Sequence, residues 1–233
     1  MGGGAGVKVV PEILFEDNHL LVVVKPVNIP TQADDSGDPD LLSILKADIK
    51  ARYQKPGNVY LGLVHRLDRP VGGVMVFAKT SKAASRLSEQ IRNREFSKSY
   101  LAVIHGSPQK SKGSLRHYLL KNQSDNTVQA FSAPEPEAKE ATLDYEVIGC
   151  QGNLSLVKIR LNTGRSHQIR VQFATISHPL YGDQKYGADV NRPGQQIALW
   201  SAELSFKHPT RDETMQFQSA PPPVAPWNLF SNS

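Results

Sequence analysis

Short runs of alternating apolar and polar residues, separated by glycine- and proline-containing turns, recur along the 233-residue chain. A period of two is typical of β-strands with one buried face, and turn residues mark where such strands end. The fold is therefore expected to be rich in sheet, with an antiparallel hairpin near the end of the chain. The predicted strands span residues 13–16, 20–25, 60–64, 74–78, 96–105, 114–120, 127–131, 141–149, 154–161, 202–207 and 213–219.

Three segments carry a helical pattern instead. Asp40 is a candidate N-cap for a helix whose apolar stripe extends to Tyr53. Thr80 or Ser81 can cap a second helix, and a third is predicted over residues 166–176. In this third helix one face would carry Ile169, Phe173 and Ile176, and another would carry His167, Arg170 and Ala174. Its N-terminus would thus present cationic groups.

Nothing in the composition divides the chain, so one compact domain is expected over residues 11–230. The glycine-rich residues 1–10 are expected to be a flexible leader, and residues 231–233 a tail. The single cysteine, Cys150, cannot close a disulfide within the chain, which favours the reducing cytoplasm. The longest aliphatic run, residues 20–24, is far too short to span a bilayer, so no membrane association is expected.

The charge and the motifs narrow the class of function. With 27 Lys plus Arg against 22 Asp plus Glu, the net charge of +5 favours a polyanionic partner. One cysteine and the lack of an HExxH motif argue against an obligatory metal site. Neither a Walker A pattern nor GxGxxG is present, and a kinase catalytic loop does not fit because its aspartate would stand one place earlier.

The polar cluster His65-Arg66-Leu67-Asp68-Arg69-Pro70 interrupts two predicted buried strands. In an extended segment Arg66 and Asp68 would point to the same side, and nearby cations would keep the carboxylate ionised. The glycine pair at 72–73 is expected to break the chain before the next strand. From these residues alone, a structural ion pair is favoured over catalysis as the explanation of the cluster.

Several segments together resemble the RNA pseudouridine synthases of the RluA family. HRLDRPVGGVMVFAKT at 65–80 is similar to the family's catalytic motif, and Asp68 matches its aspartate. The opening ILFEDNHLLVVVKPVNIPTQ also resembles the family, where it delivers a Lys-Pro pair to the edge of the active-site cleft. Further matches follow in the family's order: FSKSYLAVIHG at 96–106, LNTGRSHQIRVQFA at 161–174, HPLYGDQKYG at 178–187 and ELSFKHP at 203–209.

The resemblance implies an α+β pseudouridine synthase fold, in which helices flank a mixed, mainly antiparallel sheet and the active site lies in a cleft. It also implies an isomerase that breaks the bond between uracil and ribose, rotates the base and rejoins it through carbon, without a cofactor or metal. Asp68 would be the reacting carboxylate, attacking the sugar or the base or assisting removal of a sugar proton. Arg170 would keep Asp68 ionised and oriented, and Tyr100 would stack on the base and assist removal of the proton from C5.

The same resemblance implies RNA, ribosomal or transfer, as the partner. The target uridine must leave its stack, and Arg66 would fill the vacated space or contact a phosphate. Arg165 and His167, at the start of the third helix, would contact phosphates or orient the pocket. Only about ten residues precede the entry segment, so the S4-type RNA-binding domain of many relatives is expected to be absent. A monomer without an obligatory protein partner is expected.

Two departures from the family pattern are present. Pro70-Val71-Gly72-Gly73 partly replaces the usual Thr-Ser-Gly or Val-Ser-Gly and could alter the turn that aims Asp68. Trp200 stands where a histidine is frequent and could reshape the pocket edge. Two alternatives stay open: a noncatalytic RNA-binding or RNA-folding protein that retains the fold, and a generic basic interaction domain.

Overall fold

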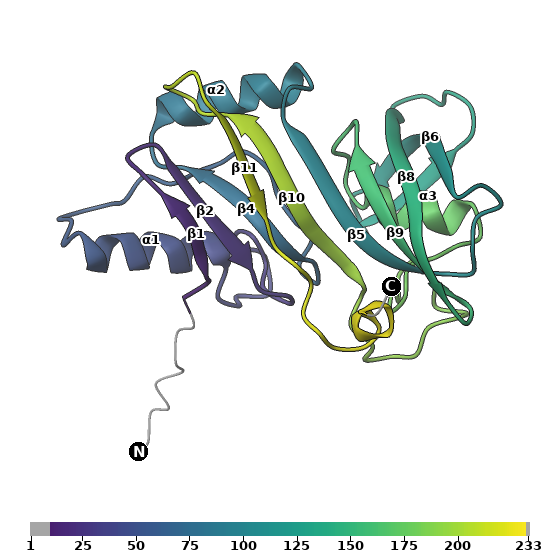
Figure 1. Ribbon diagram of the computed structural model, residues 1–233. Coiled ribbons are helices and arrows are strands. Elements are labelled where there is room, and N and C mark those ends of the chain that lie inside the picture. Colours follow the sequence, from purple (N-terminus) through teal and green to yellow (C-terminus); the bar gives the residue numbers. More distant parts are fainter. Residues whose placement is uncertain (1–9, 232–233) are drawn as a thin grey trace.

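The computed structural model describes residues 10–231, and within them eleven strands form one sheet (Figure 1). Most of the expected leader, and of the short tail, lies outside these residues. The strands are β1 (Ile13–Glu16), β2 (Leu20–Lys25), β3 (Gly62–Leu63), β4 (Gly72–Ala78), β5 (Ser97–His105), β6 (Lys112–Asn122), β7 (Thr127–Phe131), β8 (Lys139–Gln151), β9 (Leu154–Leu161), β10 (Leu199–Lys207) and β11 (Thr214–Gln218). The helices are α1 (Leu41–Arg52), α2 (Ser81–Arg92), α3 (Gln168–Thr175) and the 3-10 turn η1 (Trp227–Phe230).

Strand β10 comes late in the chain but lies at the centre of the sheet, whose main order is β1-β2-β4-β10-β5-β9-β8-β6-β7. It pairs with β4 in parallel and with β5 antiparallel, while the other described strand pairs are antiparallel. The expectation of a mixed, mainly antiparallel sheet with flanking helices is confirmed. Because β10 joins β4 to β5, it brings the segment before β4 close to the middle of β5.

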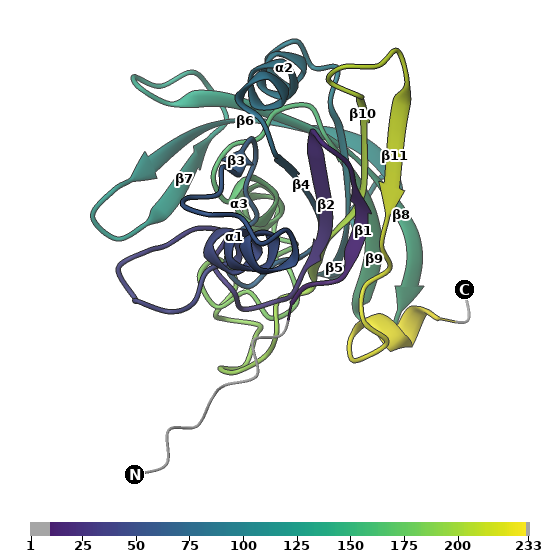
Figure 2. The ribbon, with the colours of Figure 1, turned by 90° about the vertical axis from the view of Figure 1, so that its left-hand side faces the viewer.

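Successive side chains of β4 point to opposite faces of the sheet, and different helices pack on the two faces. Met75 and Phe77 join the core cluster that also holds residues of α1 and α3. Val74 and Val76 point the other way, into the cluster that holds residues of α2. All seven residues of β4 are therefore buried. Figure 2 shows α1 and α3 on the same side of the curved sheet.

The first two helices begin where the capping residues predict. The Asp40 carboxylate accepts the backbone N–H of Ser43 at 3.0 Å, and the Thr80 hydroxyl accepts that of Ala83 at 3.1 Å. The third helix begins at Gln168, two residues later than predicted. The reason lies at His167, which adopts a left-handed backbone conformation with φ of 52° and therefore precedes the helix.

Gly72 and Gly73 do not break the chain, contrary to expectation, but are the first residues of β4. A Cβ on Gly72 would overlap the Trp200 ring, and one on Gly73 would overlap the backbone of Ser201. The two glycines thus let β4 approach β10. The strand predicted over residues 60–64 is reduced to the two residues of β3. Between residues 10 and 231 no helix has the length and apolarity needed to cross a bilayer.

Candidate active site

A large cleft, of about 1390 Å³, opens beside the loop that leads into β4. Its walls come from that loop, from β5, from the segment that precedes α3 and from α3 itself. Asp68, Tyr100 and Arg170 all line it, and so do Arg66, Arg165 and His167. The structure therefore brings together, in one cleft, six residues that the sequence separates by up to about a hundred positions.

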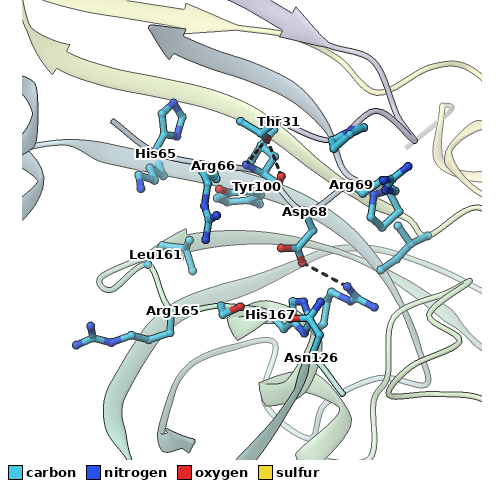
Figure 3. Close-up of a pocket in the computed structure, with 18 of the residues that line it drawn as sticks. Thr31, His65, Arg66, Asp68, Arg69, Tyr100, Asn126, Leu161, Arg165 and His167 are labelled. Atoms are coloured by element: carbon cyan, nitrogen blue, oxygen red, sulfur yellow. Dashed lines mark hydrogen bonds and ion pairs between the residues drawn. The ribbon is translucent and has the colours of Figure 1, made fainter. Parts of the chain in front are cut away.

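Asp68 lies in a tight turn that the surrounding backbone holds in place. The Val71 N–H donates to the Asp68 carbonyl at 2.9 Å, which closes the turn. On the preceding residue, the Leu67 carbonyl accepts the Thr31 hydroxyl at 2.9 Å, and the Leu67 N–H donates back to that oxygen at 3.3 Å. The Asp68 side chain is 30% exposed and faces the cleft (Figure 3).

Lys25 supports this turn from below. It is fully buried, and its ammonium donates to the carbonyls of Pro26 at 3.1 Å, Arg69 at 3.0 Å and Val71 at 2.6 Å. Burial lowers the pKa of Lys25 to about 7, against the opposing effect of the Asp68 charge. The entry segment was expected to bring a Lys-Pro pair to the edge of the cleft, but Lys25 lies beneath the turn, because its three donors satisfy three backbone carbonyls there.

Arg170 connects Asp68 to a second, deeper carboxylate. Its Nη1 lies 3.3 Å from Oδ2 of Asp68, while its Nε and Nη2 each donate to Asp183 at 2.9 Å. The Asp183 carboxylate also accepts the N–H groups of Lys185 and Tyr186. Burial alone would lower the pKa of Arg170, but the hydrogen bonds and charges of Asp183 and Asp68 outweigh it and raise that pKa. The bidentate contact with Asp183 thus fixes the guanidinium that faces Asp68.

Tyr100 lies on β5, where it pairs with Ser201 of β10 and Ile159 of β9. Only 6% of the residue is exposed, and Figure 3 shows its ring beside Asp68. Burial, with the Asp68 charge as a smaller contribution, raises the pKa of Tyr100. The phenol is therefore protonated at neutral pH and presents an aromatic face next to the carboxylate.

The three expected RNA-binding residues lie in different settings. Arg66 is exposed, points into the cleft, and has no ion pair among residues 10–231 (Figure 3). Arg165 points away from Asp68 in Figure 3, and its Nε donates to the Glu140 carbonyl at 3.0 Å. The His167 Nδ1 lies 2.6 Å from the hydroxyl of Tyr186. Their contacts with RNA stay predictions.

The environment of His167 determines its protonation. The Tyr186 oxygen accepts the Val128 N–H at 2.9 Å and lies 2.6 Å from Nδ1 of His167, and these contacts orient the ring. Burial lowers the pKa of His167, against the opposing effect of Asp68. An oriented imidazole, neutral at pH 7, therefore lies beside Asp68.

Sequence reasoning missed Asp183 and Tyr186, although both lie in the segment HPLYGDQKYG that carries part of the family resemblance. An aspartate directly after Tyr-Gly, in a segment that matches the family, was the available signal. Lys98 was not singled out from the sequence either, yet it lines the cleft, and burial lowers its pKa to about 8. Among the described residues, no cluster of three His, Cys, Asp or Glu is arranged to hold a metal ion.

Trp200 does not reshape the pocket edge, contrary to expectation. It is buried, its indole N–H donates to the Ser219 carbonyl at 3.1 Å, and its ring packs over Gly72. The other departure is the segment that begins at Pro70. Lys25 holds it by donating to the carbonyls of Arg69 and Val71, and Gln196 donates to the Pro70 carbonyl at 2.7 Å. A bulky indole at position 200 fits because position 72 is a glycine.

Comparison with known proteins places these features in a family. The profile of the family described as RNA pseudouridylate synthase matches residues 19–175. An uncharacterized RNA pseudouridine synthase of Bacillus subtilis is 34% identical over 94% of this chain and 70% of its own length. A ribosomal large subunit pseudouridine synthase D of Zymomonas mobilis is 33% identical over 91% of this chain and 69% of its own length.

Solved structures agree with the sequence comparison. Human RNA pseudouridylate synthase domain containing 1 is 26% identical, with a TM-score of 0.73 over 97% of this chain and 88% of that one. Human RNA pseudouridylate synthase domain containing 4 shares the fold at 24% identity, with a TM-score of 0.75 over 91% of this chain and 88% of that one. The chain therefore belongs to the RNA pseudouridylate synthase family and is an isomerase that converts uridine in RNA to pseudouridine.

Proposed function

We propose that this enzyme modifies ribosomal RNA of the large subunit, with Asp68, Tyr100 and Arg170 as its catalytic residues. The observation that carries the proposal is the state of Asp68. Its Oδ2 contacts Arg170, whereas its Oδ1 has no protein partner within residues 10–231 and faces the cleft. Among the acidic residues that line the cleft, Asp34 and Asp183 both form closer contacts with arginines. Asp68 is thus the carboxylate that can reach a substrate.

The reaction requires a defined exchange of bonds. The bond between C1′ of ribose and N1 of uracil breaks, the base rotates, and a bond forms between C1′ and C5. The proton on C5 is then lost, and N1 ends with a proton. Asp68 serves this sequence as a nucleophile or as the base that takes a sugar proton. Arg170 fixes the direction of the carboxylate through its own attachment to Asp183.

Tyr100 has two tasks in this scheme. Its ring, beside Asp68, offers a flat surface on which the flipped uracil stacks. Because burial keeps the phenol protonated, its hydroxyl accepts the C5 proton only while it passes its own proton onward. A phenylalanine at this position would keep the stacking surface and lose the proton transfer.

The RNA enters along the basic walls of the cleft. Arg66, exposed and pointing inward, takes the space that the flipped base leaves or contacts a phosphate. Arg165 contributes at the rim, and His167 contacts a phosphate or orients the pocket beside Asp68. We take residues 11–230 as one catalytic domain that works as a monomer in the cytoplasm. Large-subunit ribosomal RNA is favoured over transfer RNA because relatives from Zymomonas mobilis and Haemophilus influenzae carry that activity in their names.

Release of tritium from uridine labelled at C5 tests the proposal. Forming the C5 glycoside displaces that label, so the wild type releases tritium from ribosomal RNA transcripts, whereas Asp68→Asn releases only background. The substitution keeps the side-chain shape, and an RNA-shift assay confirms that binding is intact. Stronger release from transfer RNA transcripts would overturn the ribosomal assignment. Tight binding without release from total RNA of cells lacking the protein would favour a noncatalytic RNA-binding protein.

A further inference from the structure

The acidic loop of residues 31–38 packs against the turn that carries Asp68. Arg69 directly follows the catalytic aspartate, and its guanidinium lies 2.6 Å from the Asp34 carboxylate and 2.7 Å from that of Asp38. It also donates to the Ser36 hydroxyl at 2.7 Å. The Asp34 carboxylate in turn accepts the Ser36 backbone N–H at 3.0 Å. We call Arg69, Asp34, Ser36 and Asp38 the acidic clamp.

The clamp separates two arginines that look alike in the sequence. Arg66 and Arg69 flank Asp68 and both line the cleft. Arg66 has no ion pair among the described residues, whereas Arg69 faces two carboxylates. The three ionised side chains of the clamp carry a net charge of −1, one positive and two negative. Arg69 is therefore not available to bind phosphate, and the clamp itself repels the RNA backbone.

We propose that Asp34 and Asp38 are positioning residues for the isomerisation, which act through Arg69 to hold the turn that aims Asp68. The proposal rests on the function proposed above for Asp68. Two acidic residues at the rim of an RNA-binding cleft lower its affinity for RNA. We therefore infer that they benefit catalysis in another way. The geometry points to this benefit: the clamp restrains the backbone on the C-terminal side of Asp68.

The turn is held from three directions. On the N-terminal side, Thr31 satisfies both backbone groups of Leu67. From below, Lys25 holds the carbonyls of Arg69 and Val71. The clamp holds the Arg69 side chain from the solvent side. Thr31 begins the loop that supplies the clamp, so one segment restrains the residues on both sides of Asp68. Displacing a reacting group by about 1 Å can lower turnover roughly a hundredfold.

The test is a set of charge-matched variants in one loop. Asp34→Asn and Asp38→Asn, singly and together, weaken the clamp. Asp35→Asn is the control, because Asp35 is exposed and forms no ion pair within residues 10–231. Each is measured for single-turnover tritium release, for RNA affinity and for thermal unfolding. Arg69→Lys and Arg69→Met are compared, since lysine keeps the charge and loses the forked contact with two carboxylates.

We expect the double variant to lose turnover by about tenfold or more, while its RNA affinity rises a few-fold. Asp35→Asn raises affinity by a similar factor per charge and keeps wild-type turnover. Arg69→Lys retains more turnover than Arg69→Met. Wild-type turnover in the double variant overturns the proposal, and so does a joint loss of turnover, affinity and melting temperature, which would indicate a merely structural role. A wild type that releases no tritium would instead refute the proposed function.

Discussion

The buried contact between Arg170 and Asp183 allows a prediction whose size follows from the structure. Asp183 is 1% exposed and accepts two N–H groups of Arg170 at 2.9 Å. Asp183→Asn keeps the shape of the side chain and an oxygen acceptor but leaves the guanidinium beside a neutral amide. Breaking a buried pair in this way costs about 3–5 kcal/mol. Because Asp68 still lies 3.3 Å from Arg170, we expect the lower end, about 3 kcal/mol.

Urea unfolding followed by circular dichroism measures this loss, and tritium release measures its effect on catalysis. Turnover should fall by roughly tenfold or more, because Arg170 is no longer held from behind as it faces Asp68. Asp189→Asn is the matched control. Asp189 is exposed, and its substitution removes the same charge from the same segment. A loss of stability below about 1 kcal/mol with unchanged turnover would refute the argument that Asp183 anchors the site.

Two further predictions concern the sheet and the cleft. Gly73→Ala should lose about 2 kcal/mol more than Gly57→Ala in thermal unfolding, because both glycines have positive φ but only at position 73 would a Cβ overlap the neighbouring strand; equal losses would contradict this account. Burial lowers the pKa of Lys98 to about 8, so its positive charge is present at pH 7 and is lost as the pH rises above that value. The KM for RNA should therefore rise between about pH 7 and pH 9 in the wild type and stay flatter in Lys98→Arg, whose charge persists; identical pH profiles would show that Lys98 does not attract RNA.

Secondary structure was largely predictable because its signals are local. The runs at residues 127–131 and 154–161 are strands with the predicted bounds. The caps at Asp40 and Thr80 also start their helices as predicted. The exceptions arose where distant contacts override local preference. The glycine pair at the start of β4 was predicted to break the chain, although it belongs to the strand and lets β10 approach it.

The proposed catalytic residues were identified from the sequence for a different reason. Asp68, Tyr100 and Arg170 were recognised through resemblance to a family, and the structure brings them into one cleft. Of the residues that support them, Asp183 was not recognised, and Lys25 was expected at the edge of the cleft rather than under the turn. Asp183, which anchors Arg170, and Lys25, which holds the turn from below, act through contacts between segments far apart in the chain. No spacing rule relates such segments.

The two arginines beside Asp68 show most clearly what each level of information determines. The sequence by itself determined that cationic side chains flank a carboxylate between two strands, because the alternation of a strand and the turn residues are properties of neighbouring positions. Only the tertiary structure decided that Arg69 is paired with carboxylates 31 and 35 residues away, while Arg66 has no ion pair within residues 10–231. Charge pairing depends on distance in space, and that distance exists only once the loop has packed against the turn.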